Sequence, residues 1–109
     1  GCANGVPIGL AIDSGTFTTI HSITTTVADF EEVYIWLSNI NTTQEVVTLT
    51  FGGTSANNKV IVKVPAETTV LAVPGWTFQG ASGPNTITGA STTANKVNVH
   101  GYINLIDDA

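Results

Sequence analysis

The stretch KVNVHGYINLI, residues 96–106, alternates polar and apolar positions from Lys96 to Leu105. The apolar row consists of Val97, Val99, Gly101, Ile103 and Leu105. Because successive side chains of a β-strand point to opposite faces, this pattern predicts a long strand with one buried and one solvent-facing side. We therefore expect His100 and Tyr102 on the outer face of a sheet.

Three further stretches have the same period of two residues, and no stretch of useful length has a helical period. They are EVYIWLS (32–38), EVVTLTF (45–51) and KVIVKVP (59–65), and each predicts a half-buried strand. A turn of helix is expected only at ADFEEVY, residues 28–34. The interval NINTTQ, residues 39–44, is short and rich in turn formers, so it predicts a hairpin between the first two of these strands.

The stretch TVLAVPGWTF, residues 69–78, contains a Pro-Gly pair beside two aromatic residues. Proline cannot donate to a β-ladder, and glycine adopts a positive φ readily. We therefore expect Pro74 and Gly75 to end one strand and to turn the chain, so that Trp76 and Phe78 lie on the same side of the next segment. Several short strands at intervals of about ten residues indicate an all-β antiparallel sandwich or barrel.

The first part of the chain has a weaker pattern. It is rich in threonine, has glycines at positions 1, 5, 9 and 15, and lacks an apolar row beyond Phe17, Ile20 and Ile23. Such a segment is compatible with a core strand or with an extended arm. We adopt the hypothesis of an N-terminal arm over residues 1–27 and a β-sandwich domain over residues 28–109. Deletion of residues 1–20 is then expected to leave a folded domain.

Composition limits the classes of function. The 109 residues fit one domain, and three lysines, no arginine and eight carboxylates give a net charge of −5. This charge excludes the basic surface that nucleic-acid binding requires. No apolar run approaches the roughly 18 residues of a membrane span, so we expect no membrane partner. Cys2 is the single cysteine and has no internal disulfide partner.

The low share of charged residues favours an assembly. Charged residues make up 10% of the chain, against about 25% in typical soluble domains. Surface polarity must come from Thr, Ser and Asn, and aromatic residues set into such a surface suggest contact points with other subunits.

One motif has a possible catalytic meaning. AIDSGT, residues 11–16, resembles the active-site turn of aspartic proteases, in which two carboxylates share a proton. The match covers only Asp13 to Gly15, each of which is a turn former, and the glycine-rich flap and terminal helix of that family are missing. We interpret the motif as a turn and predict no enzymatic activity.

The other titratable residues are expected at the surface. His21 and His100 belong to no cluster with metal-ligand spacing, so we predict neither a metal site nor a cofactor. The pairs Glu31-Glu32 and Asp107-Asp108 are interpreted as solvated charges, because neighbours in a strand point to opposite faces and make poor acid–base partners.

Two remaining features concern carbohydrate. Asn41-Thr42-Thr43 satisfies the glycosylation sequon and is interpreted as part of a hairpin loop. Trp36 and Trp76 could line a sugar-binding platform. A sugar site normally adds carboxylates or amides beside the ring, and the sequence connects none to either tryptophan. We therefore favour core or subunit contact for both.

Three segments together resemble a known family. YIWLSN, FGGTSANNKVIVKVPAETTVLAVPGWTF and VNVHGYINLI, within residues 33–106, are similar to the small decoration or cement proteins of tailed-bacteriophage capsids. The resemblance implies jelly-roll-like β-sandwich subunits that trimerise on the virion surface and clamp neighbouring major capsid proteins. On this hypothesis the interface with other subunits or with the capsid comprises Phe17, Ile20, Ile23, Trp36, Trp76 and Phe78.

Other functions fit the same pattern. A head-tail connector component, a tail or baseplate ring subunit, or the base of a head fibre would have a similar sequence. A carbohydrate-binding sandwich that uses Trp36, Trp76 and the loops at one end is the alternative from a different class.

Overall fold

The computed structural model describes residues 7–23, 30–52, 56–79 and 85–106. These residues form strands and one 3-10 turn, η2 (Ala56–Asn58), with no α-helix among them. The strands are β1 (Ile8–Gly9), β2 (Ala11–Ile12), β3 (Thr18–Ile23), β4 (Phe30–Asn39), β5 (Glu45–Phe51), β6 (Lys59–Val64), β7 (Thr69–Gln79), β8 (Asn85–Ser91) and β9 (Val97–Ile106). The predicted all-β class is confirmed. The helical turn predicted near residue 30 is wrong in its described part, because β4 begins at Phe30.

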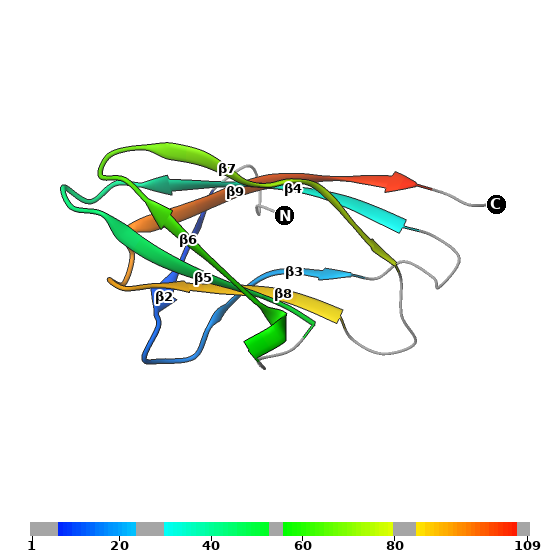
Figure 1. Ribbon diagram of the computed structural model, residues 1–109, viewed down its shortest axis with the longest axis horizontal. Helices are drawn as coiled ribbons and strands as arrows, with labels where there is room; N and C mark the ends of the chain where they lie inside the picture. Colours follow the sequence, from blue (N-terminus) through cyan, green and yellow to red (C-terminus); the bar gives the residue numbers. More distant parts are fainter. Residues whose placement is uncertain (1–6, 24–29, 53–55, 80–84, 107–109) are drawn as a thin grey trace.

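The strands form two sheets that lie as two layers (Figure 1). Sheet A has the order β1-β9-β4-β7 and is antiparallel throughout. Sheet B has the order β2-β8-β5-β6, with β3 also paired to β8. Only the short β2–β8 pair of sheet B is parallel.

The predicted hairpin between β4 and β5 is wrong. β4 pairs with β7 and β9, whereas β5 pairs with β6 and β8, so residues 40–44 carry the chain from one sheet to the other. Each of these strands has an apolar row on one face only. Two such rows are both buried when the strands belong to facing sheets.

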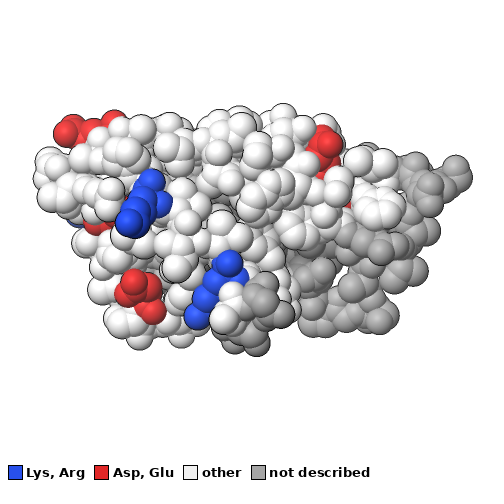
Figure 2. Space-filling model, in the orientation of Figure 1, with Lys and Arg blue, Asp and Glu red and all other residues white. Residues whose placement is uncertain are grey.

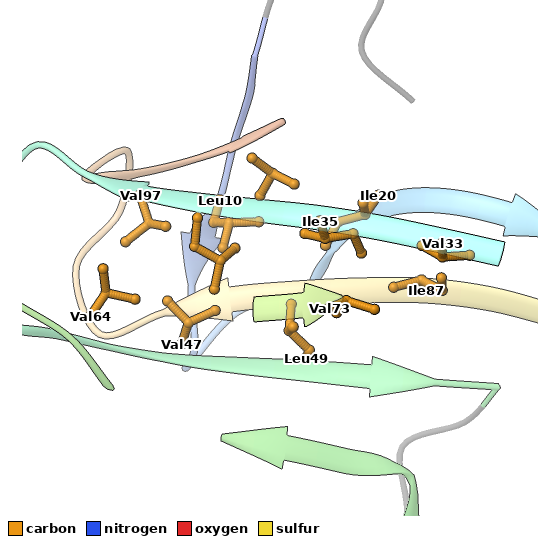
Figure 3. Packing of buried hydrophobic residues seen from close by; sticks show 12 residues of the cluster. Leu10, Ile20, Val33, Ile35, Val47, Leu49, Val64, Val73, Ile87 and Val97 are labelled. Carbon is orange, nitrogen blue, oxygen red and sulfur yellow. The ribbon is translucent and has the colours of Figure 1, made fainter. Parts of the chain in front are cut away.

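The core lies between the two sheets (Figure 3). Its buried side chains are Val33, Ile35, Leu37, Val73, Val97 and Val99 from sheet A, Ile20, Val47, Leu49, Val64 and Ile87 from sheet B, and Leu10. The inward rows predicted for β4, β5 and β9 are confirmed where the structure describes them. Valine and isoleucine dominate, as expected for side chains that fit a pleated surface.

The N-terminal segment is part of this core. β1 pairs with β9 in sheet A, β2 pairs with β8 in sheet B, and Leu10 between them has no exposed surface. The Leu10 N–H donates to the Val97 carbonyl at 3.0 Å, and the Leu10 carbonyl accepts from the Asn95 N–H at 3.0 Å. The prediction of an arm is therefore wrong for residues 8–23, and removal of residues 1–20 would delete core side chains. Residues 1–6 and 24–27 of the predicted arm lie outside the described residues.

The Pro-Gly pair does not end a strand. β7 runs without interruption from Thr69 to Gln79, and β-bulges at Ala72 and Gly75 absorb the irregular residues. Pro74 is tolerated because β7 is the edge of sheet A, where an N–H can face away from the ladder. Gly75 supplies the positive φ, 84°, that such a bulge requires. The expected sharp turn is thus a local distortion of an edge strand.

Two buried polar side chains fasten the loops that cross between the sheets. Asn39 donates from Nδ2 to the carbonyls of Thr43, Val64 and Pro65 at 2.9, 3.0 and 3.2 Å. Its Oδ1 accepts from the Asn41 N–H at 2.8 Å. Because this buried amide is satisfied on both sides, it joins the β4–β5 and β6–β7 connections at little desolvation cost.

Glu45 holds the same end of the molecule. Its carboxylate is 1% exposed and accepts hydrogen bonds from Asn41 Nδ2, Thr92 Oγ1 and the Thr93 N–H at 2.9, 3.0 and 2.8 Å. Burial alone raises the pKa of Glu45, but the hydrogen bonds from Asn41, Thr93 and Thr92 outweigh it and hold the pKa below the ordinary 4.5.

The lowered pKa of Glu45 predicts that the stability of the protein falls in acid. A depressed pKa contributes stability that is fully present above about pH 4.5 and is lost as the pH falls through the folded-state pKa. Glu45→Gln should lower the free energy of unfolding by about 1–3 kcal/mol at pH 7, because one amide oxygen replaces two carboxylate oxygens. This difference should shrink toward pH 3 in urea titrations. The exposed Glu67→Gln is the control, and a wild-type pH slope in the Glu45 variant would contradict the assignment.

Gly101 allows the close approach of β9 to β4. It pairs with Ile35, and a Cβ built on it would collide with the Tyr34 carbonyl oxygen. Gly9 in β1 has no such restriction, because its nearest atoms would lie 3.7 Å from a Cβ.

We expect Gly101→Ala to lower the free energy of unfolding by about 3 kcal/mol, since the added methyl group must push two backbones apart. Gly9→Ala should change it by less than about 0.5 kcal/mol. Urea unfolding followed by circular dichroism measures both variants. Equal losses would show that the β4–β9 spacing is not the constraint.

Candidate functional site

The outer face of sheet A carries a group of three aromatic side chains, Tyr34, Trp36 and Tyr102, which we call the aromatic face. Tyr34 and Trp36 alternate with the buried residues of β4, and Tyr102 lies opposite Tyr34 on β9. Side chains of directly opposed residues share a face, so the register brings the three rings together. Tyr102 is 49% exposed, which leaves the group accessible from solvent.

The three rings contact one another in nearly parallel planes. The Tyr34 and Tyr102 centroids are 4.6 Å apart with an interplanar angle of 14°. Trp36 lies 6.4 Å from Tyr34 and 5.8 Å from Tyr102, with angles of 22° and 29°. Stacking of this kind adds about 0.5–1.5 kcal/mol per pair beyond the buried area. The aromatic face is therefore an ordered surface rather than three independent side chains.

Apolar residues of β7 extend the aromatic face on one side. Leu71 lies opposite Trp36 and is 44% exposed, and Pro74 lies opposite Tyr34. Gly75 makes room for the Tyr34 ring, because a Cβ at this position would lie 2.9 Å from Tyr34 Cζ and Oη. The bulge on the edge strand thus shapes the aromatic face.

Polar side chains border the rings. Glu32 Oε1 accepts a hydrogen bond from the Tyr34 hydroxyl at 2.8 Å and from Asn104 Nδ2 at 3.2 Å. At the other end of β4, the hydroxyls of Ser38 and Thr69 are 2.8 Å apart. The hydrogen bond to Glu32, with burial and the nearby charge, raises the pKa of Tyr34 above 10.0, so its hydroxyl stays a donor.

A second aromatic group lies between the sheets at the β7 edge, and we call it the edge cluster. Phe51 of β5 stacks on Phe78 at 5.5 Å and 10°, and contacts Trp76 at 5.6 Å and 54°. Trp76 lies opposite the buried Val33, which places it on the inner face of sheet A, yet 38% of its surface is exposed. The predicted apolar patch of Trp76 and Phe78 is present in this geometry, joined by Phe51.

The structure separates the residues predicted for an interface. Trp36 and Trp76 lie on opposite faces of sheet A, so they cannot line one platform. Ile20 is 6% exposed and belongs to the core, which removes it from any interface. Phe17 is half-buried between β2 and β3, and the side chain of Ile23 lies outside the described residues.

Two residues expected as plain surface groups form a link between the sheets. His21 of β3 and Glu31 of β4 approach to 2.6 Å between Nε2 and Oε1, and their side chains are 20% and 4% exposed. The interpretation of Glu31 as a solvated charge and of His21 as a surface histidine is wrong. Both occupy inward positions near the end of the core, where a single strand pattern does not reveal a partner on another sheet.

For several other candidate residues, the structure agrees with the interpretation made from the sequence. Asp13 to Gly15 form a turn in which the Gly15 N–H donates to the Ile12 carbonyl at 3.1 Å. His100 is exposed on the outer face, as predicted. Asn41 lies in a loop, although the loop joins two sheets, and Asp107-Asp108 lie outside the described residues.

The part of the chain that the structure describes contains no candidate metal site and no candidate membrane-spanning helix. No three His, Cys, Asp or Glu side chains gather there as ligands. Those residues also contain no helix long and apolar enough to cross a membrane.

No protein-family model matches the sequence, and no curated protein or solved structure matches it either. The aromatic face and the edge cluster are therefore assigned from geometry alone. Sequence reasoning placed Tyr102 outward but missed its contact with Tyr34, because the contact depends on the β4–β9 register.

The stacked geometry predicts unequal effects on two outward neighbours of β9. Tyr102→Ser should lower the free energy of unfolding by about 1 kcal/mol through loss of the Tyr34 stack. His100→Ser should change it by less than about 0.5 kcal/mol. Urea unfolding of the two variants tests the stack, and equal small effects would contradict it.

Proposed function

We propose that the protein is a structural subunit of a tailed-phage virion, a decoration or cement subunit that assembles as a trimer on the capsid and stabilises contacts between major capsid proteins. The observation that carries the proposal is the edge cluster, in which Trp76 remains 38% exposed beside Phe51 and Phe78. Partly buried aromatic side chains of this kind are frequent centres of subunit contacts.

The strand order supports a jelly-roll fold, which is common in viral capsid and lectin domains. The sheet orders β1-β9-β4-β7 and β2-β8-β5-β6, with a chain that passes between the sheets at most connections, are compatible with two interlocked Greek keys. Fold alone does not assign a function, so this observation only agrees with the family resemblance.

The edge of sheet A favours contact through side chains over strand addition. β7 carries bulges at Ala72 and Gly75 and a proline at position 74, and such features disfavour pairing with another strand. Trp76, next to this irregular edge, offers an aromatic contact that needs no free backbone groups. An interface centred on Trp76 is therefore the simplest contact for a second copy.

The surface composition agrees with an assembled protein. Charged side chains are isolated on the face seen in Figure 2, within a surface of uncharged residues. Because charged residues make up only 10% of the sequence, a subunit contact can form while burying few charges. Close packing of subunits on a shell is compatible with such a surface.

Trp76→Ala should shift the assembly toward monomers, because truncation of a central interface aromatic commonly costs about 2 kcal/mol or more. Sedimentation velocity of the wild type should give a trimer, and the variant should dissociate with its β-sheet circular dichroism retained. Trp36→Ala is the matched control and should leave the mass unchanged. A monomeric wild type, or a Trp76 variant of unchanged mass, would refute the interface.

The virion assignment is tested on particles. Phage particles are purified from a culture that produces this protein, and their protein content is measured by mass spectrometry. The protein should be present in a constant ratio to the major capsid protein. Its absence from the particles would refute the virion role and leave the Trp76 interface to stand alone.

A further inference from the structure

We propose that the aromatic face is a binding site for a neutral oligosaccharide chain. The inference goes beyond the proposed function and does not depend on it, because the aromatic face and the edge cluster lie on opposite faces of sheet A. Its basis is the combination of a stacked ring group, of which Tyr102 is exposed, with oriented oxygen and amide groups beside it.

The rings supply the apolar part of the site. Sugar rings present C–H groups on their faces, and these contact aromatic side chains that remain accessible to solvent. Tyr102 at 49% and Leu71 at 44% exposure flank the half-buried Trp36. The mutual stacking of the three rings fixes their positions before a ligand arrives, which lowers the entropic cost of binding.

The polar side chains beside the rings supply the hydrogen-bonding groups of the site. Glu32 is fixed beside Tyr34 by two hydrogen bonds to Oε1, and no hydrogen bond to its Oε2 is found among the described residues. A carboxylate oxygen held in this way accepts strongly from a hydroxyl group. Asn104 and Ser38 add an amide and a hydroxyl near the two ends of the rings. The sequence alone did not show that these polar groups lie near Trp36, because their positions depend on the strand register.

The charged groups beside the aromatic face indicate which class of ligand binds there. The aromatic face contains the carboxylate of Glu32 and no lysine within the described ranges, because Lys59 and Lys63 lie on β6 of sheet B and Lys96 precedes β9. An anionic polymer would find no permanent positive charge, because His100, opposite Trp36 on the same face, is charged only when protonated. A basic protein would find only the Glu32 carboxylate. Hydroxyl groups both donate and accept, so a neutral sugar chain satisfies this mixed border.

The shape of this sheet face favours an extended sugar chain over a single sugar as the ligand. The site follows β4 from Glu32 to Ser38 along one face of the sheet, with Tyr102 of β9 and Leu71 of β7 exposed on its two sides. An extended ligand gains contact by lying along the rings, and its affinity at one site is modest, since open faces bury little area.

Affinity electrophoresis tests this site. The intact protein is run through gels that contain dextran, mannan or mixed-linkage β-glucan as neutral polymers, with alginate as the anionic comparison. Retardation by a neutral polymer is expected, and Trp36→Ala or Tyr102→Ala should weaken it at least tenfold, which corresponds to about 1.4 kcal/mol. Trp36→Phe, which keeps a ring, should retain part of the binding.

The control is Ile61→Ala, which removes a 64%-exposed apolar side chain from sheet B and should leave the retardation unchanged. Circular dichroism confirms that the Trp36 and Tyr102 variants are folded. The proposal is overturned if the wild type is retarded only by alginate, if no neutral polymer retards it, or if retardation survives both ring substitutions. It is also overturned if Trp36→Ala changes the oligomeric mass, because the face would then be a subunit contact.

Discussion

The alternation of side chains along β4 determines the positions of both the core residues and the outward rings of sheet A. β4 lies between β9 and β7, and ten of its consecutive residues pair with β9 without a bulge. Its inward row supplies Val33, Ile35 and Leu37 to the core, and its outward row supplies Tyr34 and Trp36 to the aromatic face. A shift of one residue would exchange the two rows, so the core fixes the position of every outward ring.

The neighbours of β4 adapt to it in different ways. Gly101 on β9 removes a side chain where the two backbones are closest, whereas β7 takes up two extra residues as bulges. The bulge at Gly75 serves two purposes, since it accommodates the Tyr34 ring and distorts a free sheet edge. At the end where the loops cross between sheets, Asn39 and Glu45 satisfy buried polar groups and hold the connections in place. The arrangement gives a small chain with few charges two ordered aromatic surfaces.

The sequence predicted the parts of this structure that depend on local pattern. The period of two residues identified the strands and the inward rows, because burial on one face imposes alternation directly. It also predicted an outward Tyr102 and a grouping of Trp76 with Phe78. It did not predict which strands pair, so β4 and β5 were joined as a hairpin although they belong to different sheets. Pairing depends on contacts distant in sequence, which no local period encodes.

The errors at single residues have the same origin. Leu10 and Ile20 lie in a segment whose pattern is weak, and their burial follows from positions between two sheets. Glu31 was expected in solvent because its partner His21 precedes it by ten residues on another strand. The aromatic face was missed as a site because Tyr34 and Tyr102 meet only through the register of β4 and β9.

On the two proposals made above, the two faces of sheet A have separate roles, with Trp76 at a subunit contact and Trp36 at a ligand surface. The chain has two tryptophans, so Trp36→Phe and Trp76→Phe each leave a single tryptophan, whose emission is recorded by selective excitation. Emission spectra of both variants, recorded during dilution of the oligomer and during addition of a neutral polysaccharide, test the claim most directly. Dilution should shift only the emission of Trp76 to longer wavelength, and polysaccharide should change only the emission of Trp36. A response of both tryptophans to the same event, or of neither to any, would contradict this separation of roles.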